Sequence, residues 1–449
     1  MKYRYRNEDE LKDSGIEWLG KVPKDYKIMR SKYLWKKEKR EIQDNYGVIT
    51  AFRDGEVTLR TNRRVDGFTF SIKEVGYQGV LKGDLVISAM DAFAGAIGIS
   101  DSEGKCSPVY SVCSPIKELI PYYYKYLLKE MSQKGYILSL AKGIRERSTD
   151  FRYGEFANTF LLYPNLTEQE KIAKFLDEKT SQFDTIIAKK EKLIEKLEEA
   201  KKSLISEVVT GKVKVVKTQA GYKLEERKKE EMKDSVGNVL KEIPNTWILK
   251  KLKYNCYLKG RIGWQGLKQS EFIDKGPYLI TGMNFKNGKI NWNEVYHISE
   301  ERYNEAPDIH LKVGDVLITK DGTIGKLLFI DSLPDKASLN SHLLVMRPLN
   351  KDFIPKFLYY SLDSSYFKDY VEKVKTGTTF FGITQEAISN FNLLIPSINE
   401  QTDIVNVLDE RLDDLDSLIV KTKKEIKLLK LGKQSLISEA VTGKIEILD

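Results

Sequence analysis

The chain has 449 residues, of which 41% are apolar and 31% charged, a composition that suits two to four packed domains. The net charge of +9 is a mild excess that excludes a histone-like basic tail, so any nucleic-acid binding must be organised by the fold. Three cysteines without a CxxC pair argue against a disulfide framework or a zinc site. No signal-peptide core and no run of about 18 apolar residues is present, so we expect a cytoplasmic protein without a membrane segment.

The first half is predicted to begin with a globular unit of mixed, mostly β structure. LVISAM (85–90) is typical of a buried strand, and YYYKYLL (122–128) of a short amphipathic helix. Basic side chains gather in two stretches of this unit. Because arginine and lysine suit guanine edges and phosphates, we expect DNA contacts from these stretches, although a solvated surface loop is the alternative. The candidates are Arg53, Arg60, Arg63, Arg64, Lys142, Arg145, Arg147 and Arg152.

A long helix is predicted from Thr167 to about Val209. Asn165 or Thr167 can cap its start, and Gly211 is a natural stop. A second helix of the same pattern is predicted from Asn399 to about Val441. Apolar residues recur in both at heptad spacing, which predicts an antiparallel coiled coil between them. The apolar positions that we expect to serve these helices in docking are Leu176, Phe183, Ile187, Leu197, Leu408, Leu415, Ile419 and Leu429.

The second half begins after a charged stretch. Residues 214–233 contain few large aliphatics and are predicted to be a linker. The globular unit that follows contains VLITK (316–320), Asp321-Gly322 and TIGKLLFI (323–330), a pattern typical of a β-hairpin. KFLYYSL (356–362) predicts another short helix. Further DNA-binding candidates interleave charge and amide groups, namely Arg261, Gln265 and Lys268.

The two halves are copies. SLISEVVTGK (203–212) matches SLISEAVTGK (435–444) at nine of ten positions, and LLYPNLTEQEKIAKFLDE (161–178) aligns with LLIPSINEQTDIVNVLDE (393–410) at the same offset. Shorter echoes lie upstream, with KGDLVIS in the first half and VGDVLIT in the second. The framing blocks agree while the middles of the halves differ.

The predicted fold is therefore α+β, a tandem duplication in which two long helices separate two mixed, mostly β domains. The predicted boundaries are 1–160 for the first globular domain, 161–213 for the first long helix, 214–233 for the linker, 234–392 for the second globular domain and 393–449 for the second long helix.

Motifs of several enzyme classes are missing from the sequence. No two prolines are adjacent, so an amino-methyltransferase loop of the [DNS]PP[YFW] type is absent. No cysteine follows a proline, and no Gly-Lys precedes Ser or Thr as in a phosphate-binding loop. The three histidines, His297, His310 and His342, form no HExxH pattern. We therefore expect no catalytic residue and no metal site.

The entry segment SGIEWLGKVPKDY (14–26), the repeated LLxPxxxEQ block and the SLISExVTGK ending resemble the specificity subunits of type I restriction-modification systems. The resemblance covers both halves. It implies that each globular domain is a target recognition domain reading one half of an asymmetric bipartite DNA target. Each long helix would dock a methyltransferase subunit and set the spacer between the half-sites.

The resemblance also implies the partners. They are double-stranded DNA, two modification subunits and, for cleavage, two motor-nuclease subunits. S-adenosylmethionine, ATP and magnesium would belong to those subunits, and this chain would bind no cofactor. Base contacts would come from the DGTIG turn, from SLNSH and from TGTTFFG, which gives the candidates Lys320, Thr323, Asn340, Ser341, His342, Thr376, Thr378 and Thr379. The alternatives are a fused enzyme that methylates and cuts, and a coiled-coil scaffold that binds protein or glycan.

Overall fold

A computed structural model describes residues 2–63, 75–141, 150–219, 221–235, 240–261, 267–286, 288–375 and 382–448. Its contacts divide the chain into two compact units. The first unit contains Met1–Glu191 and Lys424–Asp449, and the second contains Lys192–Lys423. Each unit combines one globular domain with part of both long helices. Because the division falls inside both long helices, it does not test the boundaries predicted from the sequence, which stay a prediction.

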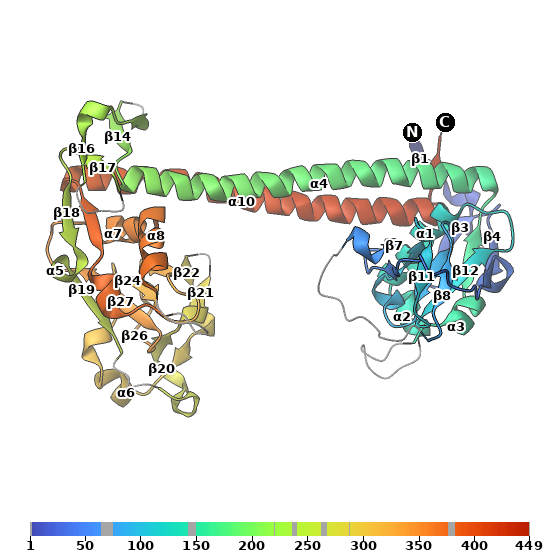
Figure 1. Cartoon of the computed structure of the whole chain (residues 1–449), viewed down its shortest axis with the longest axis horizontal. Coiled ribbons are helices and arrows are strands. Elements are labelled where there is room, and N and C mark those ends of the chain that lie inside the picture. The colour runs from blue at the N-terminus through green and yellow to red at the C-terminus, as the bar shows by residue number, and fades with distance from the viewer. Residues whose placement is uncertain are drawn as a thin grey trace. The chain divides into compact units, whose positions relative to one another are not determined.

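The two long helices confirm the predicted coiled-coil segments. Helix α4 spans Leu166–Val209 and α10 spans Ile398–Val441, with 44 residues each (Figure 1). The Asn165 side chain accepts a hydrogen bond from the Glu168 backbone N–H at 2.9 Å, so Asn165 is the N-cap of α4. Among the described residues no helix is long and apolar enough to cross a membrane.

Within the first unit the helices run antiparallel. Asp184 pairs with Lys433 at 2.6 Å and Lys190 pairs with Glu425 at 2.6 Å, so residue numbers rise along one helix as they fall along the other. In the second unit Lys201 pairs with Asp416. This pair is the repeat of the Asp184–Lys433 pair, since 232 residues separate the equivalent positions. Lys190, Lys201 and Lys433, which stand at heptad positions between the apolar residues, therefore form ion pairs from one helix to the other.

A four-stranded antiparallel sheet is the centre of each globular domain, and its strand order is the same in both. The order is β10-β9-β12-β5 in the first unit and β25-β24-β27-β19 in the second. Strand β9 matches the strand predicted in LVISAM, and β24 with β25 forms the predicted hairpin. The strands are β5 (Trp35–Lys37), β9 (Leu85–Ser88), β10 (Ile97–Ile99), β12 (Tyr110–Pro115), β19 (Cys256–Gly260), β24 (Val316–Thr319), β25 (Leu327–Phe329) and β27 (Leu343–Pro348).

Around each central sheet lie smaller ladders. The first unit pairs β1 (Tyr3–Tyr5) with β29 (Ile445–Ile447), β2 (Leu11–Asp13) with β3 (Lys21–Pro23), β4 (Lys27–Arg30) with β13 (Phe160–Tyr163), β6 (Ile49–Ala51) with β7 (Val57–Leu59), and β8 (Gln78–Val80) with β11 (Gly104–Cys106). The second pairs β14 (Val213–Thr218) with β15 (Gly221–Glu226), β16 (Met232–Asp234) with β17 (Glu242–Pro244), β18 (Ile248–Lys251) with β28 (Asn392–Ile395), and β21 (Phe285–Lys286) with β22 (Lys289–Ile290), and it has a sheet of β23 (Tyr296–His297), β20 (Ile273–Ile280) and β26 (Ala337–Leu339).

Short helices separate the central sheet from the long helices. In the first unit this helix is α1 (Pro121–Gln133), and α2 (Tyr136–Leu140) and α3 (Tyr153–Asn158) follow it. In the second unit α7 (Pro355–Asp363) and α8 (Ser365–Val374) lie between the long helices and strands β24 and β27, and α5 (Leu252–Asn255), α6 (Glu300–Asn304) and α9 (Gln385–Ser389) complete the set (Figure 1). Helices α1 and α7 confirm the two amphipathic helices predicted from sequence.

The segment that the sequence predicts as a charged linker is folded. Residues 213–226 form the hairpin β14–β15, whose register runs from Val213 opposite Glu226 to Thr218 opposite Gly221. The hairpin packs the half-buried Tyr222 and Leu224 against the core of the second unit. The Tyr222 hydroxyl also donates to Asp403 of α10 at 3.2 Å. The many charges of this segment lie on its exposed face, which is why composition alone predicts a linker.

The glutamine of the repeated EQ block joins each long helix to the short helix beneath it. Gln169 is fully buried, and its Oε1 accepts the Ile120 N–H at 2.9 Å, at the start of α1. Gln401 is fully buried too, and its Oε1 accepts the Ile354 N–H at 2.8 Å, at the start of α7. Each amide therefore satisfies a buried helix-end donor that has no partner within its own helix.

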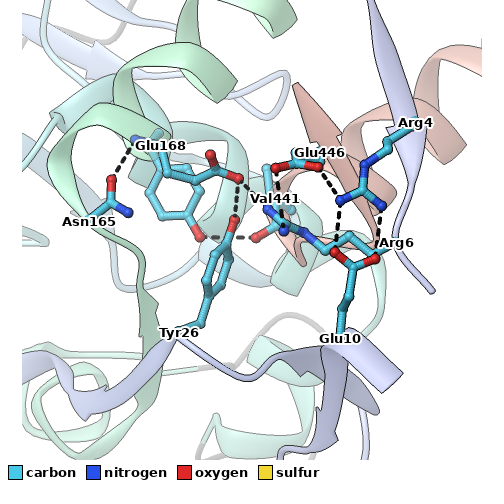
Figure 2. Close-up of polar contacts among 9 residues, drawn as sticks. Arg4, Arg6, Glu10, Tyr26, Asn165, Glu168, Val441 and Glu446 are labelled. Atoms are coloured by element: carbon cyan, nitrogen blue, oxygen red, sulfur yellow. Dashed lines mark hydrogen bonds and ion pairs between the residues drawn. The ribbon is translucent and has the colours of Figure 1, made fainter. Parts of the chain in front are cut away.

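The glutamate of the same block gathers the entry segment of its domain. Glu168 accepts hydrogen bonds from Arg6 at 2.8 Å and from the Tyr26 hydroxyl at 3.1 Å, as Figure 2 shows. Burial is the main cause that raises the pKa of Tyr26 well above its ordinary value, so the hydroxyl stays protonated and donates. In the second unit Arg227 and the Trp247 indole donate to Glu400 in the same way. The repeated motifs thus form the scaffold of the two domains.

Candidate nucleic-acid interface

In the second unit four segments meet around an open hollow of about 720 Å³. They are the turn after β20, the β24–β25 turn, the SLNSH segment before β27 and Gly382, the last residue of the predicted TGTTFFG contact region. Side chains that can contact DNA line this hollow together with glycines that keep it open. The described lining residues are Thr281, Gly282, Met283, Thr319, Asp321, Gly322, Thr323, Lys326, Asn340, His342 and Gly382.

The β24–β25 turn is held in shape from within. The Thr319 hydroxyl accepts the Lys326 N–H at 2.9 Å, and the Gly325 N–H donates to the Thr319 carbonyl at 2.9 Å. Gly322 and Gly325 have φ of +71° and +81°, the left-handed region that glycine adopts without steric cost. These contacts therefore hold the tip of the turn, with the exposed Thr323, in one conformation.

The SLNSH segment is tied to the same turn. The side-chain Oδ1 of Asn340 accepts a hydrogen bond from the His342 N–H at 3.1 Å. The Lys320 N–H donates to the backbone carbonyl of His342 at 2.9 Å. A third segment joins through the Ile383 N–H, which donates to the Lys320 carbonyl at 2.9 Å. The predicted DGTIG and SLNSH candidates are thus brought together, as part of one surface at one end of the central sheet.

The turn after β20 presents an apolar side chain at the rim of the hollow. Asn284 is buried and accepts the Thr281 N–H at 2.7 Å and the Thr281 hydroxyl at 2.9 Å. Met283, between these two anchors, is 74% exposed. Sequence reasoning missed Met283, Lys326 and Thr281, because none of them lies in a motif that the halves share.

The charge at the centre of the hollow is an ion-paired aspartate. Lys320 donates to Asp321 at 2.8 Å, and His342 Nδ1 lies 3.2 Å from the same carboxylate. Burial by itself raises the pKa of Asp321, but the hydrogen bonds from Lys320 and His342 outweigh it and lower the pKa below the ordinary value. Asp321 is therefore ionised at neutral pH and acts as a hydrogen-bond acceptor.

The first unit has a corresponding turn, one residue longer, at the same end of its sheet. Between β9 and β10 the Ser88 N–H donates to the Ala96 carbonyl at 3.0 Å, as Thr319 donates to Lys326 in the second unit. Asp91 lies in this turn and pairs with Arg53 at 2.8 Å. Its sequence, MDAFAG (90–95), contains no Asp-Gly pair, so the correspondence with the second turn is not evident from local sequence.

The basic candidates of the first unit lie on the surface and are engaged with acids or polar groups. Arg53 is 72% exposed beside Asp91, and Arg63 pairs with Asp54 at 2.7 Å and stacks over Phe52. Arg60 donates to the Thr50 hydroxyl at 3.2 Å, and the exposed Arg152 pairs with Asp150 at 2.8 Å. Surface pairs of this kind are weak enough to exchange for phosphate. The candidates Arg64, Lys142, Arg145 and Arg147 lie outside the described residues.

The prediction that Arg261 contacts DNA needs a correction. Its side chain is buried, and it donates to the Leu339 carbonyl at 3.0 Å and to the Ser338 hydroxyl at 3.1 Å. The guanidinium therefore positions the end of β26, whose Ser338 and Leu339 begin the SLNSH segment, and does not lie open to a base edge. Lys268 is exposed, and Ser341 is half-buried beside His342. The candidates Gln265, Thr376, Thr378 and Thr379 lie outside the described residues.

The eight apolar helix residues also need a corrected interpretation. Four of them are buried within this chain and so are closed to a partner: Leu176, Ile187, Leu408 and Ile419. The other four are half-buried: Phe183, Leu197, Leu415 and Leu429. Heptad spacing identified the seam inside the coiled coil. The large apolar side chains that the helices do expose are Ile186, Leu193, Ile398, Leu418, Val420, Leu428 and Leu431.

Comparisons with known proteins agree with this architecture. Residues 264–428 match the family described as type I restriction modification DNA specificity domain. The chain is 29% identical over 329 residues to the type I restriction enzyme MjaVIII specificity subunit of Methanocaldococcus jannaschii, covering 72% of this chain and 70% of the relative. It is 25% identical to the putative MjaX specificity subunit of the same organism, covering 96% of both chains.

Solved structures share the fold. A chain from a study of complex assembly and conformational transition of the type I R-M system matches with a TM-score of 0.70 at 16% identity, covering 94% of this chain and 99% of that chain. The HsdS subunit from Thermoanaerobacter tengcongensis matches with a TM-score of 0.52 at 16% identity, covering 94% and 98%.

By these matches the chain is similar to the specificity subunits of type I restriction enzymes. The resemblance predicted from the repeated motifs is thus confirmed: the similarity to the putative MjaX subunit covers 96% of the chain, and residues 264–428 match the DNA specificity domain family.

Proposed function

We propose that this chain is the DNA sequence-recognition subunit of a type I restriction-modification complex and is itself non-catalytic. Each globular domain reads one half of an asymmetric bipartite target, and the long helices set the spacer between the half-sites. The names of the related proteins support this role, since each is called a specificity subunit. The proposal also assigns DNA recognition to a particular surface, the turns at one end of each central sheet.

The observation that carries the proposal is a repeated frame with different loops. The strand order of the central sheet and the contacts of the EQ block are the same in both units. The turns at one end of that sheet differ, MDAFAG in the first unit and KDGTIG in the second. A frame kept constant beneath variable polar loops suits two domains that bind the same polymer but read different sequences.

The partners follow from the exposed side chains of the helices. In the first unit Ile186 of α4 and Leu428 and Leu431 of α10 are 43%, 58% and 53% exposed. In the second unit Leu418 and Val420 of α10 are exposed as well. We assign this apolar surface to the modification subunits, two per complex, with two motor-nuclease subunits joining for cleavage. S-adenosylmethionine, ATP and magnesium belong to those subunits.

The test is methylation-aware sequencing of DNA from cells that make this chain together with the methyltransferase encoded beside it. We expect an asymmetric bipartite methylated motif that disappears when the chain is deleted. A methylome that is identical with and without the chain would count against the proposal. In that case a scaffold with two β-rich domains becomes the better interpretation.

A further inference from the structure

An aspartate lies in the corresponding turn of both globular domains. Asp91 lies six residues before Ile97 of β10, and Asp321 lies six residues before Leu327 of β25. Ile97 pairs with Ile87 and Leu327 pairs with Ile318, so β10 and β25 correspond. The first turn is one residue longer, and Asp91 follows Ile87 by four residues whereas Asp321 follows Ile318 by three. The loops around them differ in nearly every other side chain.

In each domain the basic side chain that pairs with this aspartate comes from a different segment. Asp91 is 42% exposed and pairs with Arg53 from the segment after β6, at 2.8 Å. Asp321 is 39% exposed and pairs with its neighbour Lys320 and with His342, from the segment before β27. Ion pairs as exposed as these contribute little to stability, so stability does not explain why the acid recurs with unrelated partners.

An acid on a DNA-facing surface has a particular cost. A carboxylate repels phosphate, and the groups on a base edge that it can accept a hydrogen bond from are exocyclic amino groups, of which cytosine N4 is the usual partner of Asp and Glu. Of the described residues that line the 720 Å³ hollow, Asp321 alone is acidic. A Cβ built on Gly382 would lie 3.2 Å from Asp321 Oδ1, so a side chain there would crowd the carboxylate.

We propose that Asp91 and Asp321 are specificity-determining residues, each accepting a hydrogen bond from the amino group of one cytosine in its half-site. The inference rests on the proposed function. Arg53 in the first domain, and Lys320 with His342 in the second, balance the carboxylate while DNA is absent. They become available to phosphate or to the paired guanine when the cytosine takes their place.

The experiment selects DNA from a randomised library with the full chain in complex with its modification subunits, for wild type, Asp321→Asn and Asp321→Ala. Wild type should retain a cytosine at one position of each half-site. Asp321→Ala, which removes the acceptor, should lose that preference at one position of one half-site by about tenfold or more, because a hydrogen bond to a base edge discriminates on that scale. Asp321→Asn keeps an acceptor oxygen but gains an NH2 donor, so it should shift the preference at that position from cytosine toward adenine. Asp91→Asn should do the same in the other half-site only.

The matched control is Asp331→Asn, which removes the same charge from an exposed residue at the other end of the β24–β25 hairpin. It should leave the selected sequence unchanged. An unchanged sequence in Asp321→Asn, or the same relaxation in Asp331→Asn, overturns the inference while the proposed function stands. If wild type selects no sequence at all, the proposed function itself fails. Thermal unfolding of each variant separates lost recognition from lost folding.

Discussion

The two recognition domains solve one structural problem with different side chains. Each buries an aspartate directly before the second strand of its central sheet order, Asp84 before β9 and Asp315 before β24. Each carboxylate accepts a hydrogen bond at 2.7 Å from the backbone N–H of the residue three positions earlier in the chain. The basic partner differs. Arg40 reaches Asp84 from the chain after β5, whereas Arg347 reaches Asp315 from within β27. The position of the acid belongs to the shared frame, and its partner belongs to the individual domain.

The largest expected effect comes from removing that partner. In Arg347→Leu a fully buried carboxylate loses its ion pair, which should lower the free energy of unfolding of the second unit by about 3–5 kcal/mol. Arg40→Leu should have a smaller effect, since Asp84 is slightly less buried. Chemical unfolding of the two variants checks this order, and equal losses would show that the two pairs are interchangeable.

The Arg40 variant also has a predicted pH dependence. Burial already raises the pKa of Asp84 above its ordinary value, although Arg40 counteracts this, so removing Arg40 should raise the pKa further. A raised folded-state pKa means that stability is lost as pH rises from the ordinary value of 3.8 through the raised one. The loss relative to wild type should therefore shrink as the pH is lowered toward that window, which unfolding at several pH values measures.

The glycine of the VTGK ending gives a nearly symmetric comparison. A Cβ on Gly443 would lie 2.5 Å from Pro23, and a Cβ on Gly211 would lie 2.3 Å from Pro244. Both glycines have φ near +75°. Gly443→Ala and Gly211→Ala should each cost about 3 kcal/mol, from strain and from overpacking against a rigid ring. Gly83→Ala, with positive φ and open space around the added Cβ, is the control that isolates strain.

A smaller effect is expected at the buried glutamines. Gln169→Leu and Gln401→Leu each leave a buried N–H without its acceptor, which costs about 1–3 kcal/mol. Gln401→Leu should cost more, because its amide also donates to the carbonyls of Asp352 and Pro396 whereas Gln169 donates to Pro164 alone among the described contacts. Differential scanning calorimetry of both variants ranks them, and the reverse order would contradict this explanation.

The smallest perturbation uses the native cysteines as reporters. Burial raises the pKa of Cys106, Cys113 and Cys256 to about 12, so the folded thiols stay protonated and unreactive at pH 8. Labelling then needs opening of the first unit for Cys106 and Cys113, and of the second for Cys256. Since unfolded thiols ionise near pH 9, stability should fall as pH rises above 9. Fast labelling in native protein would contradict the assigned burial.

Sequence alone predicted the parts of the molecule that the two halves share. Repeated motifs and heptads identified both long helices, and the Asp321-Gly322 pair identified the β24–β25 hairpin. The rest depends on three-dimensional context. Composition concealed the β14–β15 hairpin because its apolar side chains, such as Leu224, alternate with charges. Heptad spacing could not tell the buried Ile187 from the exposed Ile186 as a docking residue.

The individual recognition residues were hardest to predict. Arg261 looked like a base reader, yet its burial under β26 is a property of packing that no local pattern records. Asp91 was missed since its turn lacks the Asp-Gly signature of Asp321. Loops that differ between the halves are the regions where an internal repeat gives least information, and they are also the regions that read DNA in the proposed function.

The pairing of β1 with β29 has a consequence for synthesis on the ribosome. The second unit is one continuous stretch of chain, whereas the core of the first includes Ile437, Val441 and Ile445, which are translated after the whole second unit. The first domain must therefore wait, with apolar surface uncovered, until the last helix emerges. Translation that stops early leaves a complete second unit beside an unfinished first one, a product that chaperones and proteases recognise by its exposed core.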